Sequence, residues 1–81
     1  MTETIWKVLD EHAKLTVSAS TLDDHDDLFD FGLTSHGTVN VMLGLEDAFD
    51  VEFPDRLLRK TTFQSVAAIR GALDQLGAQD H

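Results

Sequence analysis

The sequence predicts an all-α fold, a small bundle of three longer helices and one short helix. Apolar residues recur every three to four positions in three separate segments, the spacing that places them on one face of a helix. The only candidate strand is residues 51–53, which has no partner segment and is followed directly by Pro54. Amphipathic helices that must cover one another's apolar faces close into a bundle.

The first helix is expected over about residues 3–15. A threonine at position 2 or 4 can cap its start, because its hydroxyl can accept a hydrogen bond from a free backbone N–H of the first turn. The buried face of this helix is expected to hold Ile5, Val8, Leu9 and either His12 or Ala13.

A long polar loop is expected next, over residues 16–34. Five of its residues are aspartates, at positions 23, 24, 26, 27 and 30. Loops of this length without regular structure are uncommon in compact domains and are often functional. The apolar side chains that we expect to pack from this loop into the core are Leu22, Leu28, Phe29 and Phe31.

The second helix is expected at Ser35–Phe49, with a short third helix at Asp55–Arg59. Pro54 separates them, because proline lacks the N–H that a continuing helix needs. The periodicity of the second helix predicts a buried stripe of Val39, Met42, Leu43 and Phe49, with Leu45 at its edge.

The last helix is expected to open with a capping box at residues 61–64, Thr-Thr-Phe-Gln. In this motif the Thr61 hydroxyl and the Gln64 side chain satisfy each other's backbone amides. Gly77 is expected to end the helix. The apolar residues that recur at helical spacing along it are Val66, Ile69, Leu73 and Leu76.

Composition narrows the class of protein. The 81 residues are enough for one domain, spanning positions 1–81. Fifteen acidic residues against six basic ones give a net charge of −9, which disfavours nucleic acid and anionic lipid and favours partners with basic patches. No cysteine is present, so the chain has no thiol nucleophile. No apolar run is long enough to span a bilayer and no signal peptide is evident, so a cytoplasmic location is expected.

Catalytic and metal sites find little support in the residue pattern. Ser35 and His36 are adjacent, and neighbouring residues on a helix do not face each other. The aspartate cluster at 23–27 lacks the alternating acids, the glycine and the final glutamate of a calcium loop. The four histidines have no zinc-binding spacing, and the glycines near Ser35 are not followed by the Lys-Ser/Thr pair of a phosphate-binding loop.

Ser35 is the most informative residue. It follows a glycine turn at Gly32 and begins the second helix, where exposed amides and a partial positive charge suit an attached phosphate. Position alone favours a simpler role, in which Ser35 or Thr34 caps the helix.

Three segments, in the right order and at the right separations, resemble acyl carrier proteins. Residues 27–35, Asp-Leu-Phe-Asp-Phe-Gly-Leu-Thr-Ser, resemble the prosthetic-group motif of that family. Residues 43–55, Leu-Gly-Leu-Glu-Asp-Ala-Phe-Asp-Val-Glu-Phe-Pro-Asp, are similar to its second helix and the loop that follows. Residues 61–66, Thr-Thr-Phe-Gln-Ser-Val, are similar to the start of its last helix. The resemblance covers essentially the whole chain and implies the four-helix bundle of the acyl carrier protein type.

The resemblance implies that Ser35 holds a 4'-phosphopantetheine arm, derived from coenzyme A, through a phosphodiester. The terminal thiol of the arm would carry an acyl group as a thioester, and the protein would be a non-catalytic substrate of other enzymes. The implied partners are a phosphopantetheinyl transferase, a loading enzyme and a downstream acceptor enzyme. A monomer that binds neither nucleic acid nor membrane is expected.

Departures from the usual family pattern refine this expectation. Thr34 stands where the family usually has aspartate, His36 where it usually has leucine, and Asn40 at a typically acidic place. The Gly-Leu-Thr-Ser string and residues 42–55 are more similar to the small bacterial aminoacyl carrier proteins. Those proteins are loaded with glycine or alanine by stand-alone ligases similar to the catalytic core of seryl-tRNA synthetase.

Two alternatives and a docking surface remain open at this point. The chain can be an acyl carrier of a specialised lipid or polyketide pathway, or an unmodified helical interaction module with the carrier fold. Partner enzymes are expected to contact exposed residues near Ser35, although Val39 and Leu43 can equally be core residues. The expected docking residues are His36, Val39, Asn40, Leu43, Arg56 and Leu57.

Overall fold

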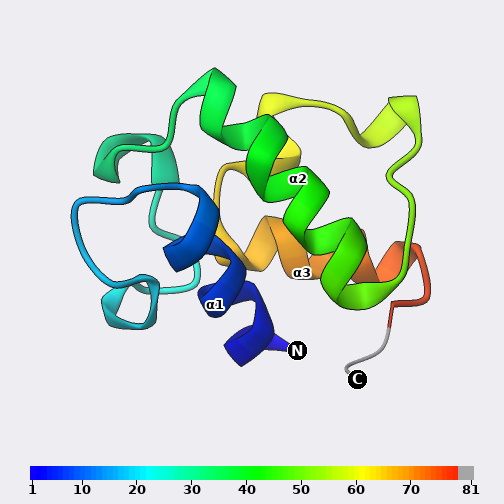
Figure 1. Ribbon diagram of the computed structural model, residues 1–81, viewed down its shortest axis with the longest axis horizontal. Helices are drawn as coiled ribbons and strands as arrows, with labels where there is room; N and C mark the ends of the chain where they lie inside the picture. Colours follow the sequence, from blue (N-terminus) through cyan, green and yellow to red (C-terminus); the bar gives the residue numbers. More distant parts are fainter. Residues whose placement is uncertain (79–81) are drawn as a thin grey trace.

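The structure is a computed structural model that describes residues 1–78, and within that range it contains helices and no strand. The all-α prediction is confirmed. Three α-helices are joined by short 3₁₀ turns, and α1 packs against both α2 and α3 (Figure 1). No helix among the described residues is both long and apolar enough to cross a membrane. In chain order the elements are α1 (Thr2–His12), η1 (Ala19–Thr21), η2 (Leu28–Phe31), α2 (Ser35–Phe49), η3 (Asp55–Leu57), η4 (Lys60–Phe63) and α3 (Val66–Gln75).

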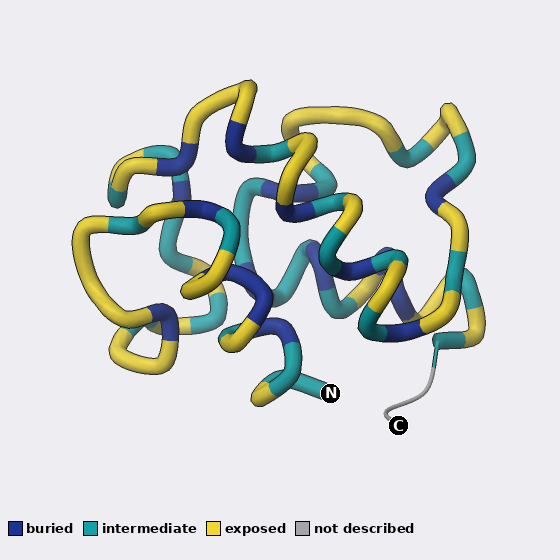
Figure 2. Tube along the Cα trace, in the orientation of Figure 1, coloured by how far each residue is buried: buried dark blue, intermediate teal, exposed yellow. Residues whose placement is uncertain are grey.

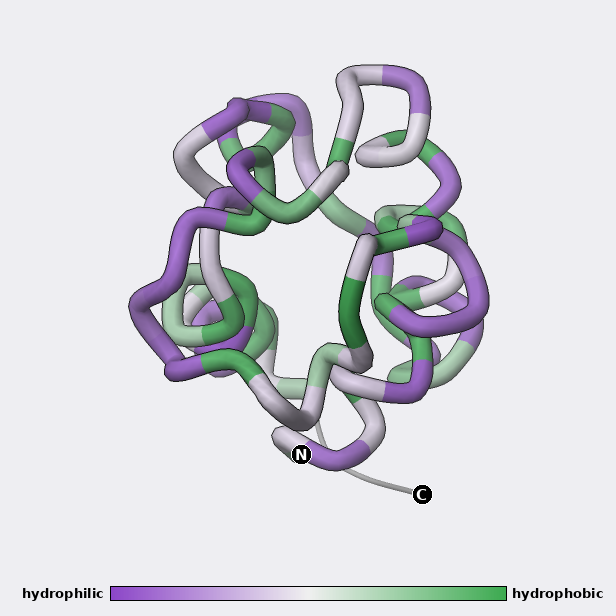
Figure 3. The backbone as a smooth tube through the Cα atoms, turned by 90° about the vertical axis from the view of Figure 1, so that its left-hand side faces the viewer, coloured by the Kyte–Doolittle hydropathy of each residue, from purple (hydrophilic) through white to green (hydrophobic). Residues whose placement is uncertain are grey.

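The hydrophobic core is built from one face of each α-helix together with residues from the connecting loops. Buried segments turn toward the interior, and hydrophilic segments gather at the periphery (Figures 2 and 3). Phe53 and Phe63 bring the 50–65 segment into this core, with ring centroids 5.5 Å apart. The largest fully buried side chains are Phe63, Ile5, Leu9, Leu28, Leu45, Ile69, Leu73, Val41 and Val66.

The bounds of α2 agree with the prediction, but its buried stripe does not. Val39 and Leu43 are 52% and 54% exposed, and Met42 is half-buried. The buried positions follow a four-residue spacing instead, at Gly37, Val41, Leu45 and Phe49, so only Phe49 of the expected stripe is fully buried.

Close approach of α1 explains which face of α2 is buried. A Cβ atom added at Gly44 would lie 2.6 Å from His12 Cδ2 and 2.9 Å from Val8 Cγ1, so α1 side chains occupy the space that a larger residue would need. Small residues let two helices pack closely. Because α2 carries apolar residues on several faces, its periodicity alone does not indicate which face α1 covers.

The predicted long loop contains two 3₁₀ turns and is tied to the start of α3. The Asp24 carbonyl accepts a hydrogen bond from the Ala67 N–H at 2.9 Å, and the Gln64 carbonyl accepts one from the Leu28 N–H at 2.8 Å. Among the apolar side chains expected to pack from the loop, Leu28 is fully buried, whereas Leu22, Phe29 and Phe31 are half-buried.

Two other helix boundaries differ from the prediction, and a third agrees with it. The first helix ends at His12, two residues before Lys14 adopts φ +53°. The expected third helix is the single 3₁₀ turn η3, which ends at Leu57 rather than Arg59. As expected, α3 ends just before Gly77, which has φ +71°.

The expected capping box at residues 61–64 is wrong. Ser65 caps α3 instead, and its hydroxyl accepts the Ala68 N–H at 3.1 Å. Thr61 belongs to η4, and the Gln64 side chain donates to Asp27 Oδ2 at 3.1 Å. The Gln64 side chain is therefore held by a long-range partner in the loop, through its amide nitrogen and not through the oxygen that a capping box uses.

Candidate functional site

The chain reverses direction immediately before α2 at a turn that requires glycine. Gly32 adopts φ +109°, a conformation that side-chain-bearing residues rarely adopt. The Phe31 carbonyl accepts the Thr16 N–H at 2.8 Å on one side of this turn. On the other side Leu33 is buried, and its N–H donates to the Leu28 carbonyl at 3.1 Å. These contacts fix the position at which α2 begins.

Thr34, and not Ser35, caps α2. The Thr34 hydroxyl oxygen accepts the Gly37 N–H at 2.9 Å, and the Thr34 carbonyl accepts the Thr38 N–H at 2.9 Å. Ser35 is the first residue of the helix and is exposed, and its hydroxyl has no hydrogen-bond partner among residues 1–78. The structure thus resolves the choice between the two candidate caps and leaves the Ser35 hydroxyl free.

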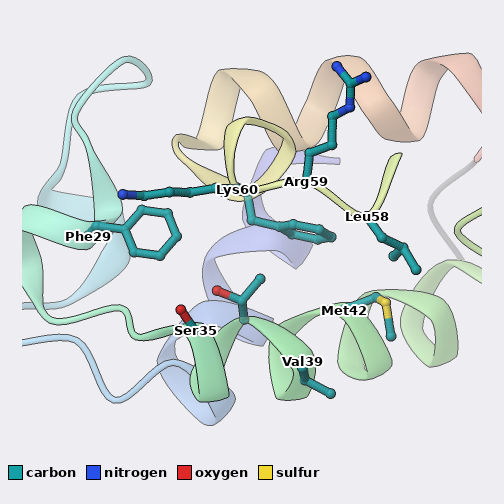
Figure 4. A pocket seen from close by; sticks show the side chains of 9 residues that line it. Phe29, Ser35, Val39, Met42, Leu58, Arg59 and Lys60 are labelled. Carbon is teal, nitrogen blue, oxygen red and sulfur yellow. The ribbon is translucent and has the colours of Figure 1, made fainter. Parts of the chain in front are cut away.

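A cavity of about 290 Å³ opens beside Ser35 (Figure 4). One wall is α2 and the other is the segment around η4, with Phe29 from η2 at one end. Most of its surface is apolar. The Lys60 side chain extends toward Phe29 and places its Nζ 4.7 Å from the ring centroid, a cation–π contact. The lining residues are Phe29, Ser35, Thr38, Val39, Met42, Leu58, Arg59, Lys60 and Phe63.

A second cavity, of about 260 Å³, lies on a different face of α2. His12 of α1 forms part of it and lies against Gly44. Of the two glycines in α2, Gly44 is the one that α1 approaches more closely. Asp47 gives this cavity an acidic side chain, unlike the first. Its lining residues are His12, Asn40, Leu43, Gly44 and Asp47.

The structure divides the expected docking residues between different surfaces. Val39 lines the cavity beside Ser35, whereas Asn40 and Leu43 line the second cavity. His36 and Arg56 are exposed and line neither. Leu57 is half-buried against the core. The docking role of all six residues stays a prediction.

Sequence reasoning missed the wall of the Ser35 cavity that comes from residues 58–63. Leu58 is 46% exposed and lines the cavity, while its neighbour Leu57 packs inward. The pair of basic residues at 59 and 60 after two leucines was the available signal, but nothing in the sequence placed it opposite α2. The missed lining residues are Phe29, Thr38, Met42, Leu58, Arg59, Lys60 and Phe63.

The aspartate cluster of the loop forms hydrogen bonds within the fold. Asp27 accepts the Phe29 N–H at 2.9 Å, and Asp26 accepts the Asp23 N–H at 2.9 Å. Asp24 accepts a 2.8 Å hydrogen bond from the Arg70 guanidinium. Within the part of the chain that the structure describes, no group of three or more histidine or acidic side chains is arranged to hold a metal ion.

Comparison with known proteins identifies the family. Residues 12–70 match the family described as "Phosphopantetheine attachment site". The aminoacyl carrier protein of Agrobacterium fabrum (strain C58) is 44% identical over 69 residues, which are 85% of this chain and 83% of that protein. Both matched regions include the segment around Ser35. The A. fabrum protein is also nearly equal to this chain in length.

Solved structures agree with this assignment. One is the engineered Bradyrhizobium japonicum glycine:[carrier protein] ligase complexed with carrier protein from Agrobacterium tumefaciens and AMP. A chain of it matches with TM-score 0.88 and 40% identity, covering 91% of this chain and 99% of that one. A solution structure from A. tumefaciens matches with TM-score 0.73 and 40% identity, covering 93% and 90% of the two chains. The chain therefore belongs to the acyl carrier protein family, whose prosthetic group is 4'-phosphopantetheine.

Proposed function

We propose that this chain is an aminoacyl carrier protein and that Ser35 is the residue to which its phosphopantetheine arm is attached. The observation that carries the proposal is the free, exposed Ser35 hydroxyl, left available because Thr34 makes the capping bond. The first N–H groups of a helix lack intrahelical acceptors and, with the helix dipole, favour a phosphate at this position. The arm supplies the terminal thiol that this cysteine-free chain lacks, on which cargo is held as a thioester.

The residues around Ser35 hold it in place for modification by another enzyme. Gly32 allows the sharp turn, Leu33 anchors the chain in the core, and Thr34 secures the first turn of α2. In this proposal the chain is a substrate and not a catalyst. A phosphopantetheinyl transferase attaches the arm, a ligase loads it, and a downstream enzyme accepts the cargo in the cytoplasm.

The aminoacyl cargo is supported by the relatives. The A. fabrum protein that is 44% identical is itself an aminoacyl carrier protein. The chain that matches with TM-score 0.88 comes from a complex with a glycine:[carrier protein] ligase. We therefore propose that a seryl-tRNA-synthetase-like ligase loads this chain with glycine or a similarly small amino acid such as alanine.

Attachment at Ser35 is tested by intact mass. The purified apo chain is incubated with coenzyme A, Mg²⁺ and a broad-specificity phosphopantetheinyl transferase. We expect the wild type and the matched control Ser20→Ala, which changes another exposed serine, to gain the mass of the arm. Ser35→Ala should gain none. An unmodified wild type, or a modified Ser35→Ala variant, contradicts the proposal.

The class of cargo is tested with the holo protein. Incubation with ATP, labelled glycine or alanine and the engineered B. japonicum ligase should give a label that hydroxylamine releases, as it does from a thioester. Loading by fatty acyl enzymes alone would indicate instead an acyl carrier of a specialised lipid or polyketide pathway. Protein from the native host that never carries the arm would indicate an unmodified interaction module.

We also propose that the partner enzymes contact the exposed side chains near Ser35. Val39 and Leu43 support this, because large apolar side chains that are more than half exposed on one helix are typical of contact surfaces. Alanine variants of the exposed residues should slow loading without lowering the free energy of unfolding by more than about 0.5 kcal/mol. Leu57→Ala should also destabilise the protein, because Leu57 packs against the core. A variant that unfolds the protein assigns its residue to the core. The residues to test are His36, Val39, Asn40, Leu43, Arg56 and Leu57.

A further inference from the structure

The surface beside Ser35 differs in charge from the chain as a whole. The protein carries 15 acidic and six basic residues, yet none of the nine residues that line the Ser35 cavity is acidic. Two of them, Arg59 and Lys60, are basic and exposed. The charge carried by the residues that line this cavity is therefore opposite in sign to the net charge of −9.

Lys60 is held in position at this surface. Its Nζ lies 4.7 Å from the centroid of the Phe29 ring, so the ammonium group stays at the edge of the cavity. The Arg59 side chain extends away from the cavity, into the space outside it (Figure 4). Of the two basic lining residues, Lys60 is therefore the one whose charged group lies at the edge of the cavity.

Apolar side chains accompany these two cations. Val39 on α2 and Leu58 on the opposite wall are 52% and 46% exposed, and both line the cavity. Exposed apolar side chains gathered around a groove are typical of contact surfaces, and their burial favours association. The surface therefore combines an apolar centre with a cationic edge.

No acidic residue lines the Ser35 cavity, although Phe29, which does line it, belongs to the aspartate-rich loop. Five acidic residues belong to this loop at positions 23–30, where Asp24, Asp26 and Asp27 accept hydrogen bonds within the fold. Asp47 lines the second cavity, on a different face of α2. Because two basic residues and no acidic residue line the cavity, the basic patch that the net charge alone predicts for a partner is not the expected complement of this surface.

We propose that the ligase that loads this chain presents an apolar surface bordered by carboxylates to the Ser35 cavity, with the carboxylates facing Lys60. This inference rests on the aminoacyl carrier function proposed above. Charges at the edge of an interface act mainly on the rate of encounter and on its salt dependence, because they remain partly solvated. Lys60 would then favour partners that carry carboxylates at this position, even though this chain has a net charge of −9.

The test compares Lys60→Glu with the matched control Lys7→Glu, which makes the same charge change at an exposed position of α1 that lines neither cavity. Both variants are converted to the holo form and loaded with glycine by the engineered B. japonicum ligase. At about 25 mM salt we expect Lys60→Glu to raise KM for the carrier roughly fivefold or more, with kcat unchanged. The increase should largely disappear at about 300 mM salt, where screening is strong. Lys7→Glu should leave KM within about 1.5-fold.

Each other outcome overturns a specific part of the argument. An unchanged or lowered KM for Lys60→Glu would contradict the acidic partner surface, and a lowered one would indicate a basic surface in its place. Equal increases for both variants would show that net charge, not the Ser35 surface, governs docking. Circular dichroism verifies that both variants are folded. If the wild-type holo protein is not loaded at all, the proposed function fails; if it is loaded and Lys60→Glu behaves like the wild type, only this inference fails.

Discussion

The hydroxyl oxygen of Thr34 accepts a 2.9 Å hydrogen bond from the backbone N–H of Gly37, and this contact supplies the N-terminal cap of α2. The adjacent Ser35 hydroxyl is consequently not needed for helix stability. Two neighbouring hydroxyl groups at the start of one helix thus have separate roles, one structural and one free for modification.

This separation predicts different effects of two alanine substitutions. Thr34→Ala should lower the free energy of unfolding by about 1 kcal/mol, because the Gly37 N–H loses its acceptor. Ser35→Ala should change it by less than about 0.5 kcal/mol. Urea unfolding of the apo protein measures both values, and Thr34→Ser should recover most of the loss. A cost at Ser35 as large as that at Thr34 would mean that the two residues share the cap.

Gly44 predicts a strong steric effect. Gly44→Ala should destabilise the protein by about 1–3 kcal/mol, because the new methyl group would meet His12 and Val8 at less than 3.0 Å. Gly71→Ala is the matched control in α3, where an added Cβ has no atom within 4 Å. It should stabilise the protein by about 0.5–1 kcal/mol, the usual gain for alanine over glycine in a helix. Equal behaviour of the two variants in urea unfolding would show that α1 does not approach α2 as closely as described.

Asp27 predicts a coupling between the loop and the segment before α3. Its two carboxylate oxygens accept from the Phe29 N–H at 2.9 Å and from Gln64 Nε2 at 3.1 Å. Asp27→Ala should therefore lower the free energy of unfolding by about 1–3 kcal/mol. Asp30→Ala, an exposed aspartate three residues later, should stay within about 0.5 kcal/mol of the wild type.

A double-mutant cycle isolates the side-chain contact within this coupling. Asp27→Ala, Gln64→Ala and the double variant are compared by urea unfolding. If the 3.1 Å contact contributes, the two single effects should sum to more than the effect of the double variant. Strictly additive effects would remove the contact as a source of stability and leave the Phe29 N–H as the only important partner of Asp27.

The ion pair between Asp24 and Arg70 predicts a pH dependence of stability. The hydrogen bond from the Arg70 guanidinium, 2.8 Å from Asp24 Oδ2, holds the pKa of the Asp24 carboxyl below its usual value, and the same contact raises the pKa of Arg70. A carboxyl whose pKa is lowered by folding stabilises the protein above its unfolded pKa, about 3.9, and this stabilisation is lost as pH falls through the folded pKa. Both side chains are partly exposed, at 42% and 32%, so the effect should be small.

Thermal unfolding of Asp24→Asn against the wild type measures this dependence. The variant should have a lower Tm near neutral pH, and the difference should shrink as the pH falls below about 4. Arg70 stays charged throughout this range and adds no change of its own. Asp23→Asn, at the adjacent exposed position, should show no such convergence. If the difference in Tm between Asp24→Asn and the wild type does not change with pH, the stabilisation comes from the neutral hydrogen bonds of this segment and not from the charge on Asp24.

The sequence by itself determined the helical class, the bounds of α2 at Ser35–Phe49 and the position of Ser35 at its start. These features depend on interactions between residues close together in the chain: helical spacing of apolar side chains, the turn at Gly32, and a threonine able to cap. The family resemblance rests on the same local segments, and the family is confirmed.

Only the tertiary structure decided which face of α2 is buried, which hydroxyl caps it and what stands opposite Ser35. Val41 and Leu45 are buried while Val39 and Leu43 are exposed, because α1 crosses α2 at Gly44 and covers that side. Gln64 bonds to Asp27, 37 residues away, so the local capping pattern at 61–64 is not used. Arg59 and Lys60 reach the Ser35 cavity through the same kind of long-range packing, which the periodicity of one segment does not encode.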